Sequence, residues 1–241
     1  MFTSFLQFLA DKKLIVDSHQ TTLLAVSGGV DSVVLCHLFK KACLPFAIAH
    51  CNFNLRGAEA DGETAFVQAL AASYEVPFYT TQFDTKTFAH NNKVSIQMAA
   101  RSLRYEFFDK LLEQYGWDKI ATAHHWDDVM ETILLNFIKG TGIKGFYGIQ
   151  PMHHQVIRPL LFARKKEIIH YAAEQKLHWE EDSSNQCNHY QRNFIRNKVI
   201  PLLHQVNPNL ASTMQTTAIQ LKDIGNLFDN HMDQIKKGKL F

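Results

Sequence analysis

A glycine-rich segment, SGGVDS at residues 27–32, combines residue types that bind phosphate groups. Gly28 and Gly29 let the backbone turn sharply and approach an anion. The segment joins an apolar run to a helical pattern, so N–H groups at a helix N-terminus would point at that anion. Ser27 and Ser32 add hydroxyl donors, and Asp31 suits a Mg²⁺ ion that bridges phosphate oxygens. We therefore expect a phosphate-binding loop formed by Ser27, Gly28, Gly29, Val30, Asp31 and Ser32.

This loop departs from two common phosphate-binding patterns. It lacks the G-K-[ST] of the Walker motif and the G-x-G-x-x-G of dinucleotide-binding proteins. An ordinary turn, in which Asp31 or Ser32 caps the following helix, is the plain alternative.

A second group of chemically active residues lies in ATAHHWDDVMET, residues 121–132. Asp128 and Glu131 are three residues apart and share one helix face, where two carboxylates suit Mg²⁺ or an ammonium group. Asp127 and Asp128 can instead simply place negative charge at a helix N-terminus. His124 and His125 precede this helix, and one of them, with His124 as the first candidate, can relay a proton near neutral pH. Joint zinc binding by His124 and His125 is disfavoured, because adjacent side chains of a strand point to opposite faces.

Several basic side chains are candidates for binding anions. Arg101 and Arg104 share a helix face and can hold a phosphate or a carboxylate in bidentate fashion, or can pair with Glu106 or Asp109 instead. Arg192, Asn193, Arg196 and Lys198 form a cluster without an acid between residues 186 and 205, which suits an RNA backbone or merely a solvated helix face. His50 ends an apolar run and is either a nucleotide contact or a core histidine with its hydrogen bonds satisfied.

The elements that position these residues follow from hydrophobic periodicity. Strands are predicted at 21–26, 46–53, 77–83 and 119–125, and they alternate with segments of helical period. This alternation predicts a parallel α/β sheet with helices on both faces, and polar clusters 27–32, 50–56 and 124–131 that converge at the carboxyl ends of the strands. Further helices are expected at 165–174 and 192–205, the latter interrupted by Pro201, with a polar helical extension after residue 210.

Composition limits the class of protein. The chain has 241 residues, 46% hydrophobic residues and a formal net charge of +2. These values exclude a mainly disordered chain and disfavour a purely electrostatic nucleic-acid binder. The four cysteines form no C-x-x-C pair, and no apolar run approaches the length of a membrane span, so we expect reduced thiols and a cytoplasmic protein without a membrane partner.

SGGVDS resembles the pyrophosphate-binding PP-loop of the N-type ATP pyrophosphatases. Four further segments resemble the tRNA(Ile)-lysidine synthetase family within that superfamily. They are HCNFNLRGAEAD (50–61), IQMAARSLRYEFF (96–108), ATAHHWDDVMET (121–132) and the stretch from EDSSN to QVNP (181–208). Phe53 and Asn54 stand where that family more often has a second histidine.

The resemblance implies an adenine nucleotide alpha hydrolase-like fold and an ATP-dependent carbon–nitrogen ligase. The implied substrates are L-lysine and an isoleucine tRNA with a CAU anticodon. Cytidine O2 attacks the α-phosphate of ATP, and the lysine ε-amine then displaces AMP. It implies that residues 1–210 form the catalytic domain, that 211–241 lead towards an absent C-terminal tRNA-binding region, and that chains can pair as a homodimer.

The resemblance also implies roles for single residues. The expected catalytic residues are Asp31, His124, Asp128 and Glu131. The expected Mg²⁺ ligands are Asp31 and Asp128. The loop 27–32 and His50 bind ATP. Lysine and tRNA contact Arg101, Arg104, Asp128, Glu131, Arg192, Asn193 and Arg196. A thiolase-type tRNA-modifying pyrophosphatase and a nucleotide-binding module without catalysis are the alternatives.

Overall fold

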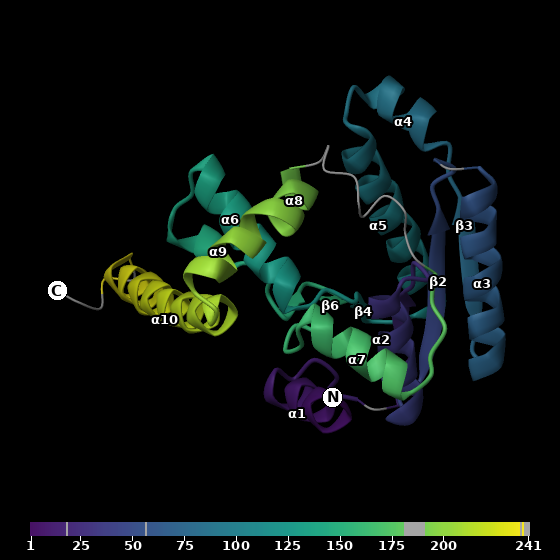
Figure 1. The fold of residues 1–241 in the computed structure, drawn as a ribbon, viewed down its shortest axis with the longest axis horizontal. Coiled ribbons are helices and arrows are strands. Elements are labelled where there is room, and N and C mark those ends of the chain that lie inside the picture. The colour runs from purple at the N-terminus through teal and green to yellow at the C-terminus, as the bar shows by residue number, and fades with distance from the viewer. Residues whose placement is uncertain (18, 56, 181–190, 237, 239–241) are drawn as a thin grey trace. The chain divides into compact units, whose positions relative to one another are not determined.

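The computed structural model describes residues 1–17, 19–55, 57–180, 191–236 and 238, and these divide into two compact units. Unit 1 comprises residues 1–125 and 151–182, and unit 2 comprises residues 126–150 and 183–241. The predicted boundary at residue 210 remains a prediction. Figure 1 shows the elements of both units.

Unit 1 is built on one sheet of six strands, counted within the described residues, in the order β3-β2-β1-β4-β6-β5. The strands are β1 (Thr22–Ala25), β2 (Phe46–Asn52), β3 (Phe78–Gln82), β4 (Ile120–Ala121), β5 (Met152–His153) and β6 (Val156–Ile157). All neighbouring pairs are parallel except β5 and β6, which form an antiparallel hairpin. The predicted parallel α/β sheet is confirmed, and the hairpin is an addition to it.

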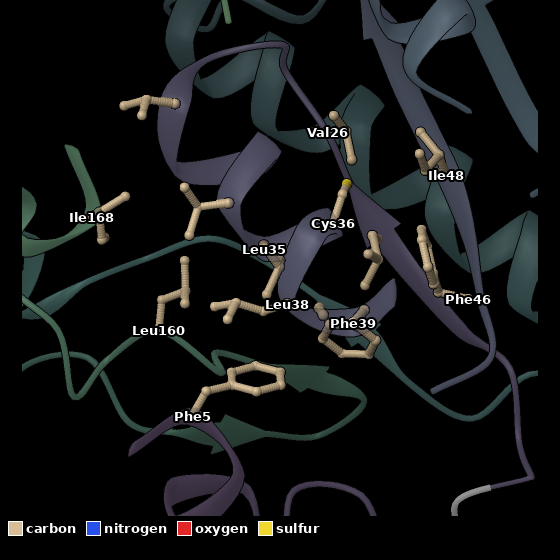
Figure 2. Close-up of a cluster of buried hydrophobic side chains, with 14 of the residues drawn as sticks. Phe5, Val26, Leu35, Cys36, Leu38, Phe39, Phe46, Ile48, Leu160 and Ile168 are labelled. Atoms are coloured by element: carbon tan, nitrogen blue, oxygen red, sulfur yellow. The ribbon is translucent and has the colours of Figure 1, made fainter. Parts of the chain in front are cut away.

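The helices of unit 1 cover both faces of this sheet. They are α1 (Phe2–Asp11), α2 (Val30–Lys41), α3 (Ala58–Tyr74), α4 (Thr85–Asn92), α5 (Ile96–Tyr115) and α7 (Lys165–Glu174). Alternate residues of a strand face opposite sides. Leu24 and Ile48 therefore join a core formed with α1, α2 and α7 (Figure 2), whereas Leu23 and Ala47 pack against α5.

Unit 2 is helical. It contains α6 (Trp126–Lys139), the 3-10 helix η1 (Ile143–Tyr147), α8 (Gln191–Phe194), a π-helical turn η3 (Ile195–Val199), α9 (Ile200–Val206) and α10 (Leu210–Lys236). The predicted interruption at Pro201 takes the form of η3, where the Ile200 N–H donates to the Ile195 carbonyl five residues back. Proline has no N–H to offer the carbonyl four residues before it, so the regular α-helical pattern cannot continue through this turn.

Candidate functional site

The loop between β1 and α2 has the backbone of an anion-binding turn. Gly28 has φ +95°, in the region that favours glycine, and Gly29 is the N-cap of α2. The N–H groups of the first turn of a helix have no partner within the helix, and here they begin at Val30. These groups, together with the positive end of the helix dipole, suit a phosphate.

The plain alternative for this loop, a side chain that caps α2, is wrong. Within the described residues, the N-cap residue Gly29 makes no side-chain capping bond to the first turn of the helix. Ser32 Oγ instead donates to the Gly29 carbonyl at 2.9 Å, and the Gly29 N–H donates to Ser27 Oγ at 3.4 Å. The two hydroxyl groups lie 3.4 Å apart. The serines therefore brace the loop and leave the helix N-terminus to a ligand.

Asp31 lies at the start of α2 beside two side chains from distant parts of unit 1. Lys165 Nζ lies 2.7 Å from each carboxylate oxygen of Asp31. His125 Nε2 lies 3.8 Å from Asp31 Oδ2. The Asp31 side chain keeps 27% of its surface exposed, so the carboxylate can still reach a ligand. Lys165 was not singled out from the sequence, and His125 was considered there only as an alternative to His124 for relaying a proton and as a zinc ligand.

His50 is fixed at the end of β2 by one hydrogen bond. Its Nδ1 lies 2.9 Å from the Val26 carbonyl, which can only accept, so Nδ1 carries the proton. Burial lowers the pKa of His50, and the bond to Val26 opposes part of that change. Nε2 is then an acceptor, and it is buried without a hydrogen-bond partner among the described residues. The alternative of a fully satisfied core histidine is therefore not supported within that part of the chain.

The two arginines of α5 are held by aromatic rings. The Arg101 guanidinium lies 4.9 Å from the Tyr105 ring centroid, and that of Arg104 lies 5.2 Å from the Phe53 ring. Arg104 also partly offsets the effect of burial, which raises the pKa of Cys51 to about 12. Arg104 thus lies against Phe53, the residue that follows the carboxyl end of β2.

Two further contacts concern the partners of the α5 arginines and of His124. Glu106, one of the acids that could pair with Arg101 or Arg104, forms an ion pair with Lys110 at 2.7 Å. His124 Nδ1 lies 2.8 Å from Thr122 Oγ1, so the hydroxyl of its own strand segment helps to fix its ring. The catalytic role predicted for His124 remains a prediction.

The predicted convergence holds for the strand ends of unit 1. His50 of β2 bonds the end of β1, His125 after β4 approaches Asp31 after β1, and Arg104 lies over Phe53 after β2. Parallel strands bring their carboxyl ends to one edge, which explains this meeting of residues that are far apart in sequence. Residues 126–131 belong to unit 2 and are described with that unit.

The site of unit 2 consists of two carboxylates of α6 and two arginines of the segment α8–η3. Arg192 Nε donates to Glu131 at 2.7 Å and its Nη2 to Asp128 Oδ1 at 3.1 Å. Arg196 Nε donates to Glu131 at 2.5 Å and its Nη2 to Asp128 Oδ1 at 3.3 Å. The Glu131 side chain is 1% exposed, whereas each arginine side chain is more than a third exposed. The carboxylates therefore lie at the buried bottom of the cluster, and the guanidinium groups lie at its accessible surface.

This arrangement changes the interpretation of the basic cluster near residue 192. Two of its cations, Arg192 and Arg196, neutralise carboxylates that we expected to receive Mg²⁺ or a substrate ammonium. Asn193 lies on the same short helix, α8. The D-S-S-N motif at 182–185 and Arg56 of the second motif lie outside the described residues.

The residues of each site can be tested for Mg²⁺. The ion is usually held by one or two carboxylates together with substrate phosphates. Asp31 fits this requirement, because it is a partly exposed carboxylate beside an anion-binding loop. Asp128 fits it less well, because its Oδ1 already accepts from two guanidinium groups. The described residues contain no group of three or more histidine, cysteine or acidic side chains suited to a metal ion.

Comparison with known proteins identifies the family. The chain matches the PP-loop domain over residues 2–203. It is 39% identical over 227 residues to a tRNA(Ile)-lysidine synthase of Parabacteroides distasonis, with 94% of this chain and 52% of the relative covered. It is 37% identical over 236 residues to one of Chlorobaculum tepidum, with 96% and 71% covered. The chain belongs to the tRNA(Ile)-lysidine synthase family of PP-loop proteins.

The family assignment confirms the resemblance seen in the motifs. The chain spans about half the length of the relatives from Parabacteroides distasonis and Bacteroides thetaiotaomicron, at 52% of each. Among the described residues, every helix falls short of the length and hydropathy that a membrane span needs.

Solved structures show the fold alone, because their identities to this chain are low. The U34-tRNA thiolase NcsA from Methanococcus maripaludis, solved with its [4Fe-4S] cluster, superposes with a TM-score of 0.71 at 16% identity, covering 91% of this chain and 78% of the thiolase. An NH3-dependent NAD synthetase from Campylobacter jejuni gives 0.54 at 15% identity, with 91% and 94% covered. The thiolase alternative is not favoured, since the relatives at 37–39% identity are named lysidine synthases.

Proposed function

We propose that this chain carries the catalytic part of an ATP-dependent ligase that joins L-lysine to the wobble cytidine of an isoleucine tRNA with a CAU anticodon. The observation that carries the proposal is the anion-binding loop with Asp31 at its helix, in a chain 37–39% identical to tRNA(Ile)-lysidine synthases. AMP and pyrophosphate are the expected products.

We assign ATP to unit 1. The loop 27–32 would hold the phosphates through backbone N–H groups and the two serine hydroxyls. The unpartnered Nε2 of His50 would accept a hydrogen bond from the nucleoside. Mg²⁺ held by Asp31 would neutralise the phosphate charge when bound. Arg101 and Arg104 are the candidates for a phosphate or carboxylate at the same strand ends.

We assign lysine to the cluster of unit 2. A free amino acid carries both an ammonium and a carboxylate, and the cluster offers carboxylates at its base and guanidinium groups at its rim. Asp128 and Glu131 would receive the ammonium, and Arg192 and Arg196 the carboxylate or an RNA phosphate. A histidine or carboxylate must also accept a proton, because attack requires a neutral ε-amine and free lysine has a pKa near ~10.4. His124 is the predicted candidate.

The order of the chemical steps follows the family's reaction and is part of the proposal. Cytidine O2 attacks the α-phosphorus, and pyrophosphate leaves. The lysine ε-amine then attacks C2 of the adenylated cytidine, and AMP leaves. A tRNA-modifying enzyme works where tRNA is, so the proposal also places the chain in the cytoplasm.

The decisive experiment measures pyrophosphate release from ATP with lysine, with and without the CAU-anticodon tRNA. We expect sustained release only when all three substrates are present, because without lysine the adenylated cytidine is not consumed and release stops at one pyrophosphate per tRNA. Asp31→Asn should lower release by about 100-fold or more with an unchanged circular-dichroism melting curve, because the amide is a much weaker ligand than the carboxylate for the Mg²⁺ that would neutralise the phosphate charge. Glu106→Gln, a change in an exposed ion pair, is the matched control. Release driven by glutamine, ammonia or aspartate instead of lysine would overturn the proposal.

A homodimer remains a further proposal. α10 exposes Ile219, Ile224, Leu227 and Phe228, four large apolar side chains that a second copy can cover. Sedimentation of the parent and of Leu227→Glu tests it: a parent dimer that the variant dissociates is expected, and a monomeric parent refutes it.

A further inference from the structure

Lys165 is positioned rigidly beside the phosphate-binding loop although no motif includes it. It is the first residue of α7, whose buried Ile168 and Tyr171 pack in the same core as α2. The Glu167 side chain accepts the Arg164 N–H at 2.7 Å and so fixes the first turn of α7. The backbone that carries Lys165 is therefore held in place, while the ammonium ends a flexible four-carbon stem.

The ammonium of Lys165 forms a bridge to both carboxylate oxygens of Asp31, at 2.7 Å each. Asp31 is the second residue of α2, next to the N–H groups that would receive a phosphate. A group that reaches both oxygens of this carboxylate is within a side-chain rotation of an anion bound at the same helix end. The lysine retains 39% exposure, so it has room to turn.

Charge balance indicates why the loop needs this cation. The segment SGGVDS has no lysine of its own, unlike a Walker loop, and Asp31 adds a negative charge where a triphosphate would lie. Among the described residues, His125 also lies near this carboxylate, with its Nε2 3.8 Å from Asp31 Oδ2. Lys165 thus supplies from α7 the positive charge that the loop lacks.

We propose that Lys165 is a phosphate-binding residue for the β- and γ-phosphates of ATP and for the pyrophosphate that leaves. Its ammonium, which contacts Asp31 here, would turn to non-bridging phosphate oxygens when the nucleotide binds. The inference rests on the proposed function only in taking the loop as the ATP site. A lesser role, in which Lys165 merely neutralises Asp31, makes different predictions.

Isothermal titration calorimetry with pyrophosphate, ATP and AMP, in EDTA to exclude metal, tests the inference. Lys165→Met should weaken pyrophosphate and ATP binding by roughly 10- to 100-fold, as the loss of a charge-assisted contact does. AMP, which lacks the β- and γ-phosphates, should bind within about twofold of the parent. Lys165→Arg should restore most of the affinity. Lys166→Met, an exposed lysine one position along α7, is the matched control and should leave all three affinities unchanged.

A double variant separates contact from neutralisation. If Lys165 only neutralises Asp31, then Lys165→Met combined with Asp31→Asn regains the pyrophosphate affinity of Asp31→Asn alone. If Lys165 binds phosphate, the double variant stays about tenfold or more weaker than Asp31→Asn. Should Lys165→Met fail to fold by circular dichroism, Lys165→Gln replaces it in every arm.

The outcomes also separate this inference from the proposed function. A parent chain that binds neither ATP nor pyrophosphate refutes both. A parent that binds pyrophosphate, with Lys165→Met binding it equally well, refutes only the role of Lys165. Selective loss in Lys165→Met supports that role even if lysine does not prove to be the substrate.

Discussion

Phe53 carries the guanidinium of Arg104 on its ring and stacks on Phe83, with ring centroids 5.7 Å apart. Phe53→Leu should therefore lower pyrophosphate release about two- to fivefold, the size of an exposed cation–π contact. Phe53→Tyr, which keeps the ring, should stay near the parent rate. In an Arg104→Ala background, Phe53→Leu should have no further effect. An equal loss in both backgrounds would show that the ring acts independently of Arg104.

Single residues were predictable from sequence only where the partners lie close along the chain. The spacing of Asp128 and Glu131 correctly places both on one face of α6. Nothing local indicates that Lys165 meets Asp31, 134 positions away, or that Arg196 meets Glu131, 65 positions away. Such pairs depend on how α2 packs against α7 and on how α6 packs against η3. The spacing of apolar residues along the chain does not specify which elements pack together.

At the scale of elements, strongly periodic segments were predictable and weakly apolar ones were not. The helix at 165–174 was predicted with its observed bounds, and the four parallel strands that alternate with helices were each located. The short helix α4 and the hairpin β5–β6 were missed, because α4 has few apolar side chains and the hairpin strands have two residues each. Asp84, whose side chain accepts the Thr87 N–H, was the available signal for α4.

The contact between η1 and α6 depends on a glycine. Gly148 has φ +61°, and a Cβ there would lie 2.6 Å from Val129 Cγ1 of α6. Gly148→Ala should lower the free energy of unfolding by about 1–3 kcal/mol through backbone strain and this clash. Gly62→Ala in α3, where a Cβ meets nothing within 4 Å, should raise it by about 0.5–1 kcal/mol. Urea denaturation measures the change in unfolding free energy for each variant. Changes of the same sign and size in both would contradict the expected effect of the clash at Gly148.

The segment α8–η3 is tied to α6 through the carboxylates of Asp128 and Glu131. Glu131→Gln removes the charge that both arginines contact, so amide exchange over residues 191–199 should accelerate by about 10-fold or more. Exchange in α2 should be unchanged, because that helix belongs to unit 1. Lysine affinity should fall in parallel if this cluster is the lysine site. Protection that is the same in parent and variant would show that apolar packing, and not the ion pairs, holds the segment.

At the scale of the whole molecule, the two compact units need not unfold as one, so stability is best followed separately in each. Unit 1 contains the sheet and its two cores, and its buried groups determine how it responds to pH. His37 and His50 both belong to it, and burial lowers the pKa of each below the ordinary value for histidine.

This common direction predicts that unit 1 loses stability on mild acidification. In the unfolded chain both histidines take up a proton near ~pH 6.5, whereas in the folded chain they are protonated only at lower pH. Stability is therefore complete above that value and falls as the pH drops through the lowered pKa values, by at most ~1.4 kcal/mol per pH unit for each histidine. Urea titrations at about pH 7.5 and about pH 5.5 measure this fall.

A variant of His50 tests the source of the fall. His50→Asn retains a donor for the Val26 carbonyl but does not titrate, so its loss of stability between the two pH values should be smaller than that of the parent. His90→Asn, an exposed control on α4, should match the parent. A His50→Asn variant that loses as much stability as the parent would show that acid sensitivity arises elsewhere, most directly in the carboxylates.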